Sequence, residues 1–221
     1  MKRGKIILIE GVSCAGKTTV CRRLSEEKEY HIFPEAIRYI ERITGKQHEE
    51  ALPTPTNEDE EKRNQKILFN VELQKIREAN ELANSGKDVV IDKSLIAVMA
   101  TAFAFEKMNG YKTSFAMSID LFKKFLGILK KEKMIFCDMF LYLDADKDVL
   151  ESRNYRREHV LDNFWINEEL LKYQHIFLEK FFERSDFNKR KINTTNLNKE
   201  ETYQMACLNI ENRVNFEEFE R

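Results

Sequence analysis

The sequence predicts an α/β protein in which helices cover both faces of a parallel sheet. Short apolar runs rich in β-branched residues alternate with longer segments whose apolar residues recur every three or four positions. The first apolar run leads into a loop that contains two glycines and then into a helical segment. Strands and helices that alternate in this way form a parallel sheet with right-handed crossovers. The chain has 221 residues, so we expect one domain over 1–221.

The first strand, over 6–9, is followed by a phosphate-binding pattern, Gly-x-x-x-x-Gly-Lys-Thr. The glycines let the backbone fold around an anion, so that successive amides and the positive end of the next helix point at a di- or triphosphate. Lys17 is expected to reach the β- and γ-phosphates, and the Thr18 hydroxyl to hold Mg²⁺. A chance glycine turn is the alternative. The predicted nucleotide-binding residues are Gly11, Ser13, Cys14, Ala15, Gly16, Lys17, Thr18 and Thr19.

The remaining elements follow from periodicity and end signals. Asn57 and Glu60 resemble a capping box, so a long helix should start there and end near Gly86. The polar segment 46–57 contains two prolines and is predicted to be a mobile loop. The expected strands are 6–9, 30–33, 88–92, 139–143 and 191–193, and the expected helices are 16–27, 36–43, 57–85, 95–108, 114–131, 168–184, one that opens at 144–146 and one from about 199.

Charge and cysteine usage narrow the class of partner. Lysine and arginine number 37 against 38 acidic residues, a formal charge of −1, so no overall field attracts nucleic acid or an acidic membrane. The four cysteines are not spaced like zinc ligands or a secreted disulfide framework. The apolar run 95–105 is about half the length that spans a membrane. We therefore expect a cytoplasmic protein whose partner is a small molecule rather than a nucleic acid polymer or a membrane.

Two carboxylates end predicted strands, where ligands bind in an open parallel sheet. Asp92 is suited to hold Mg²⁺ beside a phosphate loop, or else to cap the next helix. Glu35 could accept a proton from an attacking hydroxyl, or else compensate a helix dipole. Lys93 could neutralise phosphate or lie in solvent, and Arg38 could orient a polar acceptor.

Other polar residues lie at helical spacing. Arg153 shares a helix face with Arg156 and Arg157, and guanidinium groups on a closing lid stabilise the charge of a moving phosphoryl group. A solvated helix face is the alternative for this basic run. Asn70 and Gln74 could read a base through paired hydrogen bonds, or could simply be exposed. The four histidines have no ligand spacing, and His175 is interpreted as structural.

These motifs together resemble the deoxynucleoside kinase and thymidylate kinase group of P-loop kinases. The similarity rests on Ile9-Glu10-Gly11 leading into Gly16-Lys17-Thr18-Thr19, on Pro34-Glu35, on Asp92-Lys93-Ser94 and on the arginine-rich segment Arg153 to Glu158. It implies a P-loop NTPase fold with a five-stranded parallel sheet and an arginine-rich lid at about 151–165. Lys93 stands where that group usually has Arg, and Ala36-Ile37-Arg38 replaces the usual continuation after its Glu.

The sequence thus predicts a kinase that uses ATP and Mg²⁺ and transfers the γ-phosphoryl group to a nucleoside or deoxynucleoside hydroxyl. Lys17, Glu35, Arg153 and Arg157 would be catalytic, and Thr18 and Asp92 would hold the metal. The substrate-binding candidates are Glu35, Arg38, Asn70, Gln74 and Lys93. A thymidylate-type monophosphate kinase, a kinase for another small hydroxyl compound and a nucleotide-dependent regulatory switch are the alternatives, and a homodimer is left open.

Overall fold

The computed structural model describes the whole chain except residues 1, 48–49, 51, 157–166 and 212–221. Its centre is a five-stranded sheet in the order β2-β3-β1-β4-β5. All neighbouring strands are parallel, which confirms the predicted class. The strands are β1 (Ile6–Glu10), β2 (His31–Phe33), β3 (Val89–Asp92), β4 (Met139–Asp144) and β5 (Lys189–Asn193).

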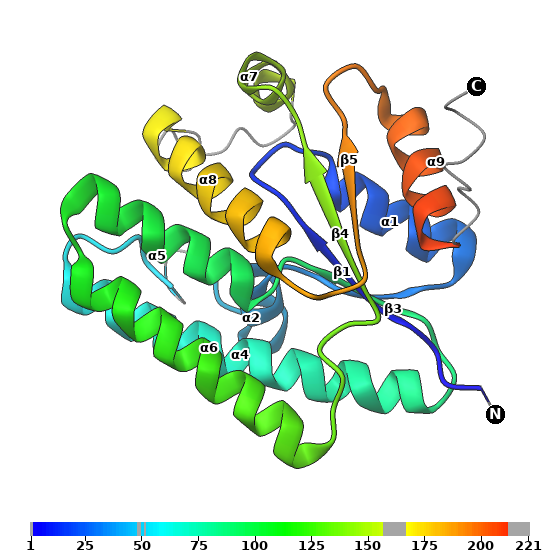
Figure 1. Ribbon diagram of the computed structural model, residues 1–221, viewed down its shortest axis with the longest axis horizontal. Helices are drawn as coiled ribbons and strands as arrows, with labels where there is room; N and C mark the ends of the chain where they lie inside the picture. The colour runs from blue at the N-terminus through cyan, green and yellow to red at the C-terminus, as the bar shows by residue number, and fades with distance from the viewer. Residues whose placement is uncertain (1, 48–49, 51, 157–166, 212–221) are drawn as a thin grey trace.

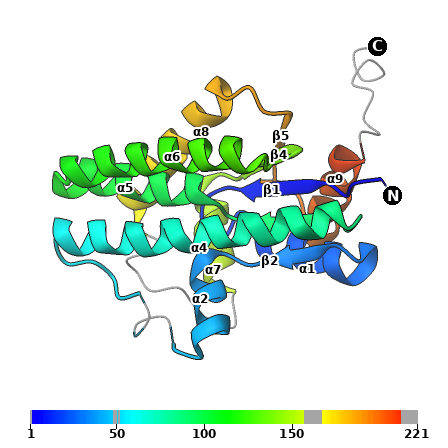
Figure 2. The same ribbon diagram turned by 90° about the horizontal axis from the view of Figure 1, so that it is seen from below.

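Figure 1 shows the helices in two layers, with α1 and α9 on one side of the sheet and α4, α5, α6 and α8 on the other. Figure 2 shows α4, α5 and α6 running beside one another. The expected helices are confirmed, with most ends within one or two residues. They are α1 (Lys17–Lys28), α2 (Ala36–Thr44), α4 (Glu58–Asn84), α5 (Leu95–Asn109), α6 (Lys112–Glu132), α7 (Lys147–Tyr155), α8 (Glu168–Arg184) and α9 (Lys199–Ile210).

Helix α4 begins as its sequence predicts. The Asn57 side chain accepts a hydrogen bond from the Glu60 amide at 3.0 Å. The reciprocal bond differs from a capping box, because Glu60 accepts from the Thr56 amide instead. Near its other end, the Gly4 amide donates to Ala83 at 2.8 Å, so α4 runs back along β1. The middle of α4 therefore lies level with the carboxyl ends of the strands.

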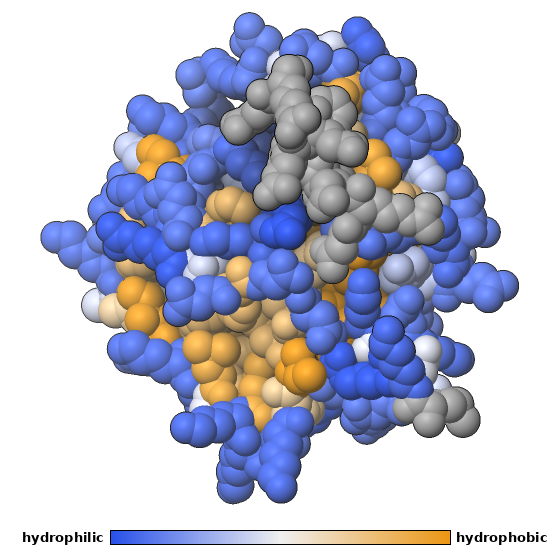
Figure 3. All heavy atoms as spheres, turned by 45° about the vertical axis from the view of Figure 1, so that its right-hand side comes forward, coloured by the Kyte–Doolittle hydropathy of each residue, from blue (hydrophilic) through white to orange (hydrophobic). Residues whose placement is uncertain are grey.

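The core lies on both faces of the sheet. Every residue of β1 and β3 is buried, which explains why each strand is apolar up to the carboxylate that ends it. β5 starts two residues earlier than its sequence suggests, because this edge strand opens with Lys-Arg-Lys and has no apolar pattern there. The view in Figure 3 is mostly hydrophilic, and its apolar residues gather chiefly in the lower half. Among the described residues, no helix combines the length and apolar character needed to cross a bilayer.

Candidate functional site

The loop between β1 and α1 has the backbone that its glycines make possible. Gly11 has a φ of 146°, and a Cβ there would lie 2.2 Å from the Leu143 carbonyl oxygen. Gly16 precedes α1 with a φ of 101°. Within the described structure no side chain caps α1, and its first turn has no acidic residue. The first amides and the positive end of this helix therefore remain suited to an anion.

Lys17 is the first residue of α1, and its side chain reaches back into this loop. Its ammonium donates to the Val12 carbonyl at 2.7 Å, and the side chain is buried. Burial, followed by the positive charge of Lys93, lowers the pKa of Lys17 to about 8. A phosphate would replace a carbonyl dipole with a negative charge, so a bound polyphosphate would raise this pKa again.

Thr18 and Asp92 meet across the sheet edge. The Thr18 hydroxyl donates to Asp92 Oδ2 at 3.1 Å. Asp92 Oδ1 is buried, and no hydrogen bond from the described residues reaches it. Burial raises the pKa of this carboxyl group. Hydroxyl and carboxylate oxygens are ligands that Mg²⁺ prefers, and the unpartnered buried oxygen fits a bound cation. The alternative capping role of Asp92 is excluded, because Ser94 caps α5 through its bond from the Ile96 amide.

Glu35 and Lys93 form an ion pair between the ends of β2 and β3. Lys93 Nζ lies 2.8 Å from Glu35 Oε2. The positive charge of Lys93 lowers the pKa of Glu35 to about 2, against the opposing effect of burial. Burial alone would lower the pKa of Lys93, but Glu35 outweighs it and raises that pKa. Lys93 is thus ion-paired, while 27% of its side chain remains exposed.

Little in the residue pattern indicated a role for Glu10, which is fully buried at the end of β1. Its Oε1 accepts from the Ser94 amide at 2.7 Å and from the Ser94 hydroxyl at 2.6 Å. Burial raises the pKa of Glu10 to about 7. The one available signal was a charged residue at the end of an otherwise apolar strand. Glu10 thus joins the strand of the phosphate loop to the turn that follows β3.

Arg153 lies on the opposite side of the phosphate loop from Glu35. Its guanidinium donates to the carbonyls of Thr194 at 2.6 Å and Leu197 at 3.2 Å, in the β5–α9 connection. It also donates to the Cys14 carbonyl at 3.4 Å. Its part in phosphoryl transfer stays a prediction. Arg157 and most of the expected lid lie outside the described residues, as does part of the expected mobile loop 46–57.

The remaining acceptor-site candidates lie on helix surfaces. Arg38 is exposed on α2 and donates to Glu41 at 2.7 Å. Asn70 and Gln74 are on the exposed face of α4, where Gln74 donates to Glu78 at 2.9 Å. Their roles also stay predictions. Two buried polar residues of α4, Glu72 and Lys75, lie near the end of β3 instead, where the Lys75 ammonium donates to the Lys93 carbonyl. The sequence signal for them was their position beside the apolar stripe of the helix.

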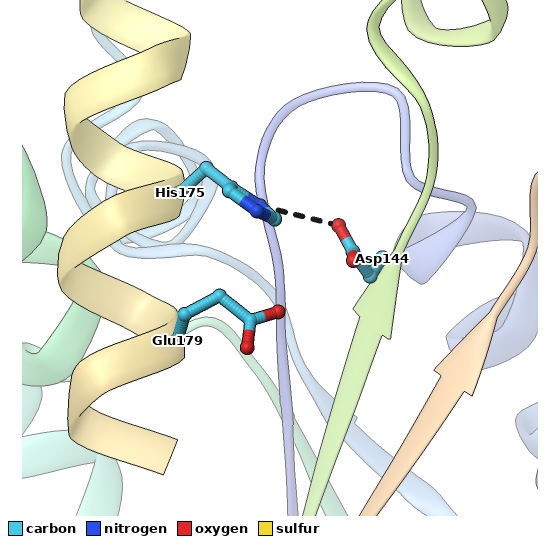
Figure 4. Close-up of side chains that lie close together, drawn as sticks. All are labelled: Asp144, His175 and Glu179. Carbon is cyan, nitrogen blue, oxygen red and sulfur yellow. Dashed lines mark ion pairs between the residues drawn. The ribbon is translucent and has the colours of Figure 1, made fainter. Parts of the chain in front are cut away.

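A second group of titratable residues lies where β4 ends. Asp144, His175 and Glu179 point toward one another, as Figure 4 shows. His175 Nδ1 is 3.2 Å from Asp144 Oδ1, and the hydrogen bond to Asp144 raises the pKa of His175. These residue types can bind metal, but the Lys191 ammonium already pairs with both Asp144 and Glu179. The group therefore ties α8 to β4 and β5, in keeping with the structural role expected of His175.

Two solved kinase structures resemble this fold. The thymidylate kinase from Candida albicans has a similar structure, with a TM-score of 0.69 and 17% sequence identity over 96% of this chain and 92% of that one. The deoxyadenosine kinase from M. mycoides, with bound dATP, has a TM-score of 0.69 and 18% identity over 94% and 99% of the two chains. These likenesses show the predicted kinase fold.

Sequence comparisons give a coarser result. No curated protein matches this chain by sequence. A family model described as an AAA domain matches residues 6–177, which include the phosphate loop, Glu35, Asp92 and Arg153. Because this match covers most of the chain, the protein belongs to the AAA domain family.

Proposed function

We propose that this protein transfers the γ-phosphoryl group of ATP, with Mg²⁺, to a hydroxyl of a nucleoside or deoxynucleoside. The observation that carries the proposal is the Lys93–Glu35 ion pair, which lies on the same sheet edge as the Thr18–Asp92 contact. Phosphorylation of a hydroxyl group needs a binding site for the phosphates of ATP and a carboxylate base nearby, and the candidates for both lie at this edge.

The donor would lie against the amides of the phosphate loop. The Lys17 ammonium would leave the Val12 carbonyl and donate to the phosphates instead. The negative charge of the phosphates would increase the fraction of Lys17 that is protonated. Thr18 and Asp92 would hold Mg²⁺, which neutralises phosphate charge when bound. Arg153 and Arg157 would stabilise charge on the moving group, with Arg153 placed by the Cys14 and Thr194 carbonyls.

The acceptor hydroxyl would lie beside Glu35. Its oxygen forms a bond to the γ-phosphorus while the bond from that phosphorus to the bridging oxygen breaks, so ADP leaves with the electron pair. The hydroxyl proton passes to Glu35. A carboxylate whose pKa is about 2 is ionised but weakly basic, so Lys93 would have to turn from Glu35 toward phosphate before this step. Arg38, Asn70 and Gln74 are the proposed contacts farther along the acceptor.

A monophosphate kinase of the thymidylate type is the second candidate. It is supported by the fold shared with the Candida albicans thymidylate kinase and by Lys93, whose ammonium could hold an acceptor phosphate. Such an acceptor is already an anion and needs no base. For either activity, the balanced net charge and single cysteines support a small-molecule substrate and a cytoplasmic location.

The test is incubation of the full chain with γ-labelled ATP, Mg²⁺ and, in turn, nucleosides, deoxynucleosides, nucleoside monophosphates and other small hydroxyl compounds. Label on a nucleoside hydroxyl supports the first proposal, and label on a monophosphate supports the second. A Lys17→Met variant is the matched control, because it removes the charge inside the phosphate loop. Slow ATP hydrolysis that no acceptor changes would refute both proposals and favour a regulatory switch.

A further inference from the structure

The turn after β3 holds Lys93 of the proposed site in a costly backbone conformation. Asp92 precedes the turn and Lys93 lies in it, with a φ of 58°. A residue with a Cβ rarely adopts this left-handed region, because the Cβ approaches the following carbonyl oxygen. Contacts with the surrounding structure must therefore hold the Lys93 backbone in this conformation. The backbone conformation in turn sets the direction of the Lys93 side chain.

The amide side of this turn is held by β1. The Lys93 amide donates to the Ile9 carbonyl at 3.0 Å. The Ser94 amide donates to Glu10 at 2.7 Å. Both bonds come from the strand that leads into the phosphate loop, so they align the turn with that loop.

The carbonyl side is held from a different element. Lys75 on α4 donates through its ammonium to the Lys93 carbonyl oxygen at 3.2 Å. The same ammonium lies 2.9 Å from Glu72 Oε1, one helical turn earlier. The side chains of Lys75 and Glu72 are 0% and 4% exposed, so this contact is shielded from water.

A buried ion pair is by itself weak evidence for a stabilising role. Removing two charges from water is expensive, and well-packed apolar residues of similar volume at such sites are often as stabilising or more so. Burial also raises the pKa of Glu72, which shows that its charged form is disfavoured there. What an apolar pair could not supply is a donor for the Lys93 carbonyl.

We propose that Lys75, oriented by Glu72, is a positioning residue that fixes the left-handed turn and thereby the places of Asp92 and Lys93. In its kinetic consequences this inference rests on the proposed kinase activity, but its structural consequence does not. Without the Lys75 bond, the Lys93 peptide would be free to rotate toward ordinary backbone angles, and the pairing of Lys93 with Glu35 would loosen.

The first experiment replaces the pair by apolar residues in the full chain, as Glu72→Leu with Lys75→Met, which are good helix formers. The matched control is Arg77→Gln with Glu132→Gln, a second α4 ion pair that lies at the surface. Backbone amide exchange of Lys93 and Ser94 should accelerate at least tenfold in the first variant and remain unchanged in the control. Unchanged exchange in a folded first variant would overturn the proposal, whatever reaction the protein catalyses.

Kinetic measurements on the same variants distinguish a misplaced turn from a general loss of structure. With the acceptor identified by the labelling panel, kcat should fall about 10- to 100-fold while KM for ATP changes less than about threefold, since misplacement of supporting groups costs this much. The melting temperature should stay the same or rise. An equal loss in the control pair, or an unchanged kcat beside a loosened turn, would remove the proposed link to the site.

The wild-type protein provides a measurement that needs no variant to fold. A buried ammonium exchanges slowly, so ¹⁵N spectra should detect Lys75 Nζ with a coupling through the hydrogen bond to the Lys93 carbonyl carbon. Absence of that slow signal and coupling, with other buried groups observed, would contradict the proposal. If the panel finds no acceptor but this coupling is present, the proposed activity fails while the positioning role stands.

Discussion

Lys93 Nζ lies 2.8 Å from Glu35 Oε2, although 58 positions separate the two residues in the sequence. β2 and β3 are neighbours in the sheet, so residues that follow them reach the same edge. The contact lowers the pKa of Glu35 and places the positive charge of Lys93 near Lys17 of the phosphate loop. In the proposed reaction, one ammonium group would therefore contact both the acceptor side and the donor side of the site.

Glu35→Gln tests the base. If the acceptor is a hydroxyl, kcat should fall by about 10²- to 10⁴-fold, because the amide cannot take the proton. The affinity for ATP should change little, since Glu35 does not line the phosphate loop. Steady-state kinetics and ATP titration measure both, and Glu200→Gln on the exposed face of α9 is the control. A loss below tenfold in kcat would exclude Glu35 as the base and favour a monophosphate acceptor.

The pKa of Lys17, about 8, predicts how ATP binding depends on pH. The charged ammonium binds phosphate, so affinity should weaken as the pH rises through 8 toward 9. Binding of ATP raises this pKa, and the protein should therefore take up protons near pH 8. Calorimetry in two buffers of different ionisation enthalpy measures that uptake. Equal proton uptake by Lys17→Met would assign the effect to another group.

Asp92→Asn should separate stability from metal use. Burial raises the pKa of Asp92, so its ionised form opposes folding at neutral pH, and a neutral amide removes that cost. Thermal unfolding should therefore occur at the same temperature or a higher one. The Mg²⁺ concentration needed for half-maximal activity should rise about 10- to 100-fold. An unchanged Mg²⁺ requirement would show that Asp92 does not hold the metal.

The variant Glu10→Gln should have a weaker pH dependence of stability than the wild-type protein. The folded state raises the pKa of Glu10 from 4.5 to about 7, so folding favours the protonated form. Stability is therefore lost as the pH rises from about 4.5 to 7, by an amount on the order of 3 kcal/mol for this group. Urea unfolding at pH 5 and pH 8 should show a smaller difference in the variant. Identical differences in the two proteins would contradict the shifted pKa.

The sequence by itself determined the secondary structure and the edge at which the site forms. Apolar run length and helical spacing reflect local burial. Gly11 is required for two reasons: its φ is 146°, and a Cβ at this position would lie 2.2 Å from the Leu143 carbonyl oxygen. The role expected of Thr18 depended on the phosphate-loop pattern, and the roles expected of Asp92 and Glu35 depended on strand ends. All three residues lie at the expected edge.

Only the tertiary structure decided which charges meet. No spacing in the chain pairs Lys93 with Glu35, Ser94 with Glu10 or Lys75 with the Lys93 carbonyl, because these contacts join different elements. Asn70 and Gln74 share a helix with Lys75, yet the packing of α4 leaves Asn70 and Gln74 exposed while it buries Lys75 and Glu72. Periodicity shows that a helix has a buried face, but the shape and charge of the neighbouring elements decide which polar groups that face can accommodate.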